Sequence, residues 1–225
     1  MMRGGALALG AVVLVGVAAG GSAGAWYALR TSGSGTNSLA SFMGVSPVPP
    51  KAAPAFTLTN QKGQPFSLAQ LRGRAVVLEF MDSHCTDICP IISQEFVDAY
   101  HDLGPKASKV AFVAVNVNQQ FNQVSAVAAF SSEHGLNAIP SWQFVTGPVP
   151  ALRHVWQQYG ISVGVEPNGT VIHNDQMYFI GPHGTERYVA TPFANERPNG
   201  TAFLPAPQIT RWGKGIARYA AKVAA

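Results

Sequence analysis

The chain's two cysteines offer the strongest chemistry in its 225 residues. Cys85 and Cys89 are separated by only three residues. A thiolate is both a nucleophile and a soft metal ligand, so such a pair can exchange disulfides or hold a metal ion. A purely structural disulfide is the alternative, and it would close too short a loop to stabilise the fold much. The spacing therefore favours a reactive or ligating pair.

A strand and a helix must position these cysteines. The apolar run over residues 75–80 predicts a buried strand, and apolar residues recur at helical spacing over residues 91–100. The cysteines thus lie on a strand-to-helix turn. Pro90 suits the first helical position and places Cys89 at or beside the N-cap, where free N–H groups and the helix dipole favour a thiolate. We expect at least one thiol pKa to be lowered, that of Cys89 first.

Other periodic segments predict the remaining elements of an α/β domain. These are a β-hairpin over 56–59 and 65–67, a helical turn after Ser67, a strand over 109–117, a helix over 123–134, a strand over 142–145, a helix over 149–159, and a second hairpin over 176–180 and 186–189. Alternating strands and helices predict crossover units and a mostly parallel sheet. We therefore expect a thioredoxin-like domain with an additional N-terminal β-hairpin over residues 54–210.

The N-terminal segment predicts export of this domain. Residues 4–29 carry no charge, and a helix of that length crosses a hydrocarbon core of roughly 30 Å. Residues 1–30 are thus expected to form a transmembrane helix that anchors the protein, or else a cleaved signal peptide ending near Ala25. Residues 31–53 are rich in Ser, Gly and Pro and predict a flexible linker. Either N-terminal alternative places the domain outside the cytoplasm, on the periplasmic side of the inner membrane if the anchor stays.

The C-terminal segment, residues 205–225, predicts an amphipathic basic helix. Four cationic side chains share one face, and apolar residues including Trp212 and Ile216 share another. Packing on the domain is favoured over contact with anionic lipid or an acidic partner. The formal net charge of +4 is scattered along the chain, so we expect no nucleic-acid partner.

Four segments in order resemble the Sco/SenC family of membrane-tethered, thioredoxin-fold copper proteins that assist cytochrome c oxidase assembly. They are His84-Cys85-Thr86-Asp87-Ile88-Cys89-Pro90, residues 142–147, residues 155–160, and His173 preceding residues 177–180. The resemblance implies that Cys85, Cys89 and His173 bind copper. It also implies delivery of copper to the copper-bearing oxidase subunit, with a thiol reductase or another copper chaperone as a further partner.

The chain departs from the family pattern at three places. Thr86 stands where proline is usual, Ile172 where an acidic residue often precedes the ligand histidine, and residues 115–122 lack the common Asp-Pro segment. None of these removes a ligand. Two thiolates and an imidazole suit Cu(I) and tolerate Cu(II), whereas tetrahedral zinc would need a fourth ligand.

A thiol-disulfide oxidoreductase that reduces the oxidase cysteines is the alternative function, with Cys85 and Cys89 as its catalytic residues. Thioredoxin-like oxidoreductases generally carry a cis-proline near their cysteines, whereas no proline lies between Pro167 and Pro182 here. His173 occupies that region, which favours metal handling. His84 is expected to be an exposed neighbour of the cysteines, and Asp87 a loop carboxylate that is either free or orients the turn. His183 is expected to be a turn residue, and the other three histidines lie in or near helices: His101, His134 and His154.

Overall fold

The computed structural model describes residues 38–225. The expected transmembrane helix or signal peptide over residues 1–30, and the linker up to residue 37, lie outside the described residues. Within residues 38–225, no helix combines the length and apolar character needed to span a membrane.

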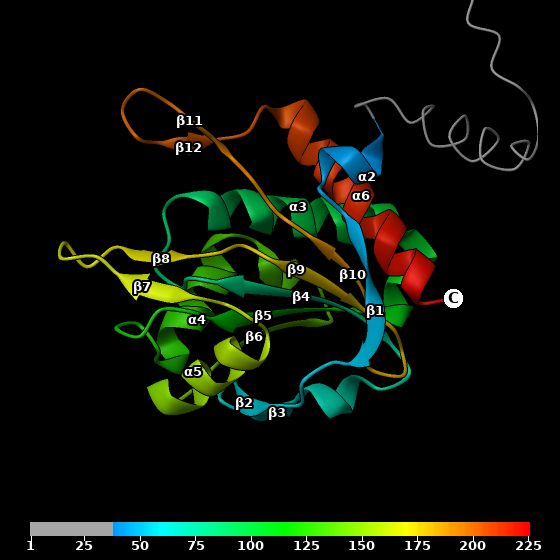
Figure 1. Cartoon of the computed structure of the whole chain (residues 1–225), viewed down its shortest axis with the longest axis horizontal. Coiled ribbons are helices and arrows are strands. Elements are labelled where there is room, and N and C mark those ends of the chain that lie inside the picture. Colours follow the sequence, from blue (N-terminus) through cyan, green and yellow to red (C-terminus); the bar gives the residue numbers. More distant parts are fainter. Residues whose placement is uncertain (1–37) are drawn as a thin grey trace, which may run out of the picture. The chain divides into compact units, whose positions relative to one another are not determined.

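Strands and helices alternate along the central part of the chain (Figure 1). The strands are β1 (Ser46–Ala52), β2 (Thr57–Asn60), β3 (Pro65–Ser67), β4 (Ala75–Met81), β5 (Val110–Asn116), β6 (Trp142–Thr146), β7 (Val163–Val165), β8 (Val171–His173), β9 (Met177–Ile180), β10 (Thr185–Ala190), β11 (Asn195–Glu196) and β12 (Ala202–Phe203). The α-helices are α2 (Leu39–Phe42), α3 (Ile88–Leu103), α4 (Val124–Glu133), α5 (Val149–Gln158) and α6 (Ala206–Val223). Short 3₁₀ helices cover Leu68–Leu71, Gly104–Lys109 and Leu136–Ala138.

Eight of the strands form one mixed sheet in the order β1-β10-β9-β4-β5-β6-β2-β3. The β4–β5 and β5–β6 pairs are parallel, as the predicted crossovers require. The β4–β9 and β2–β6 pairs are antiparallel, as are the outer pairs. The expectation of a mostly parallel sheet is therefore wrong, because hairpin strands extend the parallel centre on both sides.

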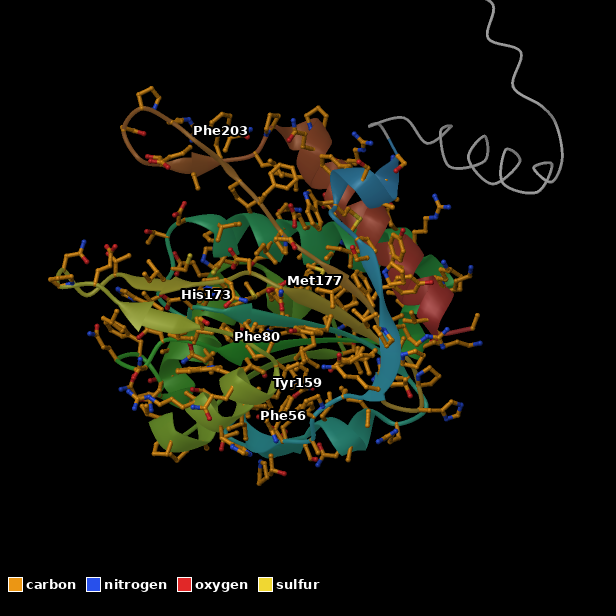
Figure 2. The ribbon with its side chains drawn as sticks, viewed as in Figure 1. Phe56, Phe80, Tyr159, His173, Met177 and Phe203 are labelled. Atoms are coloured by element: carbon orange, nitrogen blue, oxygen red, sulfur yellow. The ribbon has the colours of Figure 1, made fainter. Side chains whose placement is uncertain are left out.

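Two hydrophobic cores cover the two faces of this sheet. One face packs under α3, α4 and α6, with Val77 and Phe112 among its fully buried residues. The other packs under α5 and the β2–β3 hairpin, where the Tyr159 ring lies 5.4 Å from Phe80 and 6.4 Å from Phe56, centroid to centroid (Figure 2). Figure 1 shows α3 and α6 on one side of the sheet and α5 on the other.

Residues 38–53 correct the prediction of a linker that continues to residue 53. Residues 39–42 form α2, and β1 pairs antiparallel with β10 as the edge strand of the sheet. Proline lacks an amide N–H, which is tolerated at a sheet edge. Lys51 on β1 also forms a 3.3 Å ion pair with Glu186 of β10, which is 1% exposed. The folded domain thus begins before residue 54.

The C-terminal helix packs on the domain as expected. Trp212 and Ile216 of α6 are fully buried, and α6 lies against α3. A Cβ atom placed on Gly213 would lie 2.6 Å from the Cβ of Asp98 on α3. The absence of a side chain at this position therefore permits the close approach of the two helices.

Candidate functional site

The Cys85 turn directly follows β4 and is held by the loop after β5. The Oδ1 atom of Asp82 accepts hydrogen bonds from the His84 amide and the Asn118 side chain, both at 2.7 Å. The Ser83 hydroxyl donates to the carbonyl of Phe121 at 2.6 Å. Since Asp82 is only 8% exposed, these bonds satisfy a buried carboxylate and fix the path of the turn.

The sulfur of Cys85 takes over the role of an N-cap side chain for α3. This helix begins at Ile88, so Cys89 is its second residue, and Asp87 at the N-cap makes no side-chain capping bond. Instead, Cys85 Sγ accepts the amide N–H groups of Asp87 and Cys89, both at 3.4 Å. These donors stabilise negative charge on Cys85.

The two thiols are unlinked and differ strongly in their surroundings. A hydrogen bond from the Cys89 thiol, supported by backbone N–H groups, lowers the pKa of Cys85. Donating that bond, together with burial, raises the pKa of Cys89 well above its usual value. Cys89 is 1% exposed. The prediction of a lowered thiol pKa is thus confirmed for Cys85 and wrong for Cys89, because the proximity of a helix start does not offset burial.

His173 is the last residue of β8 and lines the same cavity as the cysteine turn. Its Nδ1 atom lies 3.3 Å from the carbonyl oxygen of Asn174 and 3.5 Å from a carboxylate oxygen of Asp175. A proton on Nδ1 faces both oxygens. The lone pair of the ring that could bind a metal then lies on Nε2. The imidazole is 7% exposed and is labelled in Figure 2.

The cavity has a volume of about 660 Å³ and brings two of the three predicted ligands together. Cys85 and His173 both line it, whereas Cys89 lies buried beside Cys85 and contributes no lining atom. Within residues 38–225, no three Cys, His, Asp or Glu side chains are grouped closely enough to hold a metal ion without rearrangement. In the described conformation the cavity therefore gives access to Cys85 and, behind it, Cys89, but the ligands do not form a closed metal site.

His84 and Asp87 also line the cavity. The His84 ring stacks on Phe121, with centroids 4.0 Å apart and planes at 13°. Asp87 is exposed, which agrees with a loop carboxylate. The remaining histidines that the sequence offered do not line the cavity; they are His101, His134, His154 and His183.

The buried carboxyl groups of Glu79 and Glu95 and the partly buried one of Asp175 were not predicted. Burial raises the pKa of Asp175, and the charge of Asp175 adds to burial in raising that of Glu79 well above its usual value. Burial also raises the pKa of Glu95 on α3, with the charge of Glu79 as a further cause. No sequence pattern marks these residues, since Glu79 stands alone in the apolar run of β4.

The SCO1/SenC family profile matches residues 46–199, more than half of the chain. The chain belongs to the SCO1/SenC family. It is 26% identical over 132 residues to the SCO1 protein homolog of Bacillus subtilis, which covers 57% of this chain and 68% of that protein. It is 28% identical over 136 residues to the mitochondrial SCO2 homolog of Mus musculus, with 57% of this chain and 52% of that protein covered. The chain thus spans about half of the mouse protein.

Solved structures of other SCO1/SenC proteins share the fold. The Arabidopsis thaliana ScoI structure with copper bound has a TM-score of 0.60 at 18% identity and covers 75% of this chain and 98% of its own. A SCO1/SenC family lipoprotein from Bacillus anthracis has a TM-score of 0.59 at 23% identity, with 76% and 98% covered. The predicted mixed α/β, thioredoxin-like fold is confirmed.

Proposed function

We propose that this chain binds copper through Cys85, Cys89 and His173 and delivers it to the copper-bearing subunit during cytochrome c oxidase assembly. The observation that carries the proposal is the shared cavity: Cys85, with its lowered thiol pKa, and His173, with Nε2 free, line the same space. Copper is the cargo here. Membership of the family and the copper bound in the A. thaliana relative support this choice of metal.

The donor set fits Cu(I) better than harder metals. Two thiolates and one imidazole are soft ligands, and three ligands leave room for a ligand from the receiving protein. Binding requires both thiols to lose their protons. Loss of the Cys89 proton removes the hydrogen bond that Cys89 donates to Cys85, and its sulfur then becomes free to turn toward the metal.

We also propose that the domain acts outside the cytoplasm, held at the membrane by the N-terminal segment. The uncharged run over residues 4–29 and the positively charged Arg3 before it support this placement. A membrane position would keep the domain near a membrane-embedded oxidase.

A second candidate function is thiol-disulfide exchange on the cysteines of the oxidase copper site. The asymmetry of the two thiols favours it, because an accessible low-pKa Cys85 suits nucleophilic attack and Cys89 beside it suits resolution of a mixed disulfide. A disulfide switch has been identified in BsSco, a Sco-family cytochrome c oxidase assembly protein whose solved structure has a TM-score of 0.54 at 23% identity.

Ligand substitutions separate the two candidates. Cys85→Ser or Cys89→Ser replaces a soft thiolate with a hydroxyl that stays protonated, so Cu(I) retention against a chelator should fall by more than the about 10–100-fold that loss of an outer-shell partner costs. His173→Ala should weaken Cu(I) binding and abolish the Cu(II) form seen by visible absorption. His183→Ala, in a distant turn, is the matched control.

A reductase predicts a different pattern for the same variants. Both cysteine changes would then abolish insulin reduction, and His173→Ala would matter little. If His173→Ala binds both copper states as the unmodified chain does, the three-ligand site is wrong.

A further inference from the structure

The two small hairpins outside the main sheet face each other across the cavity. The β7–β8 and β11–β12 pairs each form a separate two-stranded sheet, so one edge of every strand is unpaired within residues 38–225. Residues of β8, residues 199–201 before β12 and Ala202 of β12 line the cavity, whereas no residue of β7 or β11 does. Figure 2 labels His173 on β8 and Phe203 on β12, on opposite sides of the start of α3.

The hydrogen-bond pattern shows which groups of β8 lie on its open edge. Hydrogen-bonded and non-hydrogen-bonded pairs alternate along an antiparallel ladder. The Glu166 amide donates to the Thr170 carbonyl at 2.9 Å, and the next pairs are Val165 with Val171, Gly164 with Ile172, and Val163 with His173. The backbone N–H and C=O groups of Val171 and His173 therefore point away from β7, toward the open edge.

The surface around this edge has the character of a docking site. The large hydrophobic residues that are exposed within residues 38–225 are Phe121, Val165 and Ile172. Phe121 and Ile172 line the cavity, whereas Val165 lies on β7 outside it. Exposed apolar side chains gathered at one place mark interaction surfaces. The cavity lining also contains three aspartates and no lysine or arginine, which favours a segment that carries positive charge.

We propose that an extended, positively charged segment of the copper-receiving protein adds to the open edge of β8 as a further strand. The nature of the occupant rests on the proposed function. Strand addition takes its affinity from main-chain hydrogen bonds and its specificity from alternate side chains. The partner residue opposite His173 would place its side chain on the same face as the imidazole, with Cβ atoms about 4.5–5.5 Å apart. A ligand at that position would reach a metal held by Cys85 and His173.

A peptide with alternate amides blocked tests the pairing on the unmodified chain. The probe is a synthetic peptide spanning the cysteines of the oxidase copper site, with those cysteines changed to serine so that neither copper nor disulfide exchange contributes. Only every second amide of an added strand points toward β8. N-methylation of the peptide amides that point toward β8 should weaken peptide binding about tenfold or more. N-methylation of the amides that point away from β8 should leave binding unchanged.

A pair of proline variants tests the edge itself. Val171→Pro removes an N–H on the open edge of β8, and Val165→Pro removes the equivalent N–H on the far edge of β7. Proline is tolerated where the missing N–H faces away from the ladder. We expect Val171→Pro to weaken peptide binding about tenfold and Val165→Pro to leave it unchanged, with circular dichroism confirming both folds.

The outcomes separate this inference from the proposed function. Strand addition is supported if only one of the two N-methylated peptides binds more weakly and if Val171→Pro also weakens peptide binding. Equal binding of both methylated peptides, or no binding of the unmodified peptide at millimolar concentration, overturns it. Cu(I) retention by the unmodified chain, measured in parallel, decides the copper proposal independently of either result.

Discussion

Cys85 and Cys89 should react at different rates because their sulfur atoms have different surroundings. Cys85 is partly exposed and accepts hydrogen bonds, whereas Cys89 is buried and donates one. We predict that Cys85 is alkylated first and with a midpoint below the usual thiol value of about 8.5. Alkylation of the reduced, copper-free protein across pH, with the modified residue located by mass spectrometry, measures this.

Cys89→Ala provides the control for this experiment. It removes the thiol that donates to Cys85, so the midpoint of Cys85 should rise toward its usual value. Modification of Cys89 ahead of Cys85 would contradict the arrangement of the two thiols.

Glu79 should make the domain less stable as the pH rises. Burial raises its pKa well above the value of the unfolded chain, and one carboxylate oxygen has no hydrogen-bond partner among the described residues. Below the unfolded pKa, both states hold the proton. At higher pH the unfolded state releases it while the native state keeps it, so the free energy of unfolding falls until the native pKa is passed.

Glu79→Gln removes this titration while its side-chain oxygen can still accept the Phe80 amide, which lies 3.0 Å from Glu79 Oε1. We predict that the variant gains more stability relative to the unmodified chain at pH 8 than at pH 4, measured by urea unfolding. Asp102→Asn, at an exposed position of α3, is the matched control and should show no such trend. A gain that is the same at both pH values would rule out the linkage.

At the scale of elements, the contact between α3 and α6 should tolerate no added side chain at Gly213. Alanine favours a helix by about 1 kcal/mol over glycine. The added methyl group would nevertheless lie 2.6 Å from Asp98 Cβ and 3.2–3.3 Å from backbone atoms of Ala99 and Asp98. Overpacking of this kind costs about 1–3 kcal/mol. We predict that Gly213→Ala is destabilising overall in urea unfolding.

Lys214→Ala is the neighbouring control for Gly213→Ala. Lys214 is exposed on the same helix, so its substitution should change the free energy of unfolding by less than about 0.5 kcal/mol. A stabilising effect of Gly213→Ala would mean that the two helices pack less closely than described.

The elements with a regular apolar pattern or a clear turn signal were predicted from sequence, and the short strands without either were not. β4, β5, α4 and α5 lie within a few residues of their expected bounds, because buried strands and amphipathic helices have distinct periods. β1 was missed since its prolines indicate a linker, and only pairing with β10 makes it a strand. The two- and three-residue strands β7, β8, β11 and β12 are too short to show a period.

The same division holds for the candidate site. Cys85 and Cys89 were identified from residue type and spacing, whereas His173 was selected through the family resemblance, because on its own it resembles a loop histidine. The cavity that joins Cys85 to His173 depends on tertiary structure. The pKa of Cys89 is raised, where the sequence predicted that it would be lowered. The burial of Cys89 contributes to this rise, and no local pattern indicates that burial.

At the scale of the whole molecule, we predict that the folded domain faces away from the cytoplasm. The uncharged run of residues 4–29 follows Arg3, and positive charge tends to remain on the cytoplasmic side. Protease added to cells whose outer barrier has been opened should therefore degrade the domain, as detected with an antibody against residues 206–223.

A cytoplasmic enzyme serves as the control for membrane integrity in this experiment. Full protection of the domain with that control intact would contradict the prediction. A mature N-terminus at Trp26, found by N-terminal sequencing, would identify the leading segment as a cleaved signal peptide.

The unequal burial of the two thiols also bears on how the protein withstands peroxide. Because Cys85 alone borders the cavity, an oxidant such as hydrogen peroxide would meet it first and convert it to a sulfenic acid, with release of water. The sheltered thiol of Cys89 lies within hydrogen-bonding reach and can condense with that sulfenic acid, releasing a second water and forming a disulfide. A reductant can reverse a disulfide, but sulfinic and sulfonic acids are largely permanent. The sheltered thiol of Cys89 would therefore allow oxidised Cys85 to form a reducible disulfide before it is converted to a permanent sulfinic or sulfonic acid.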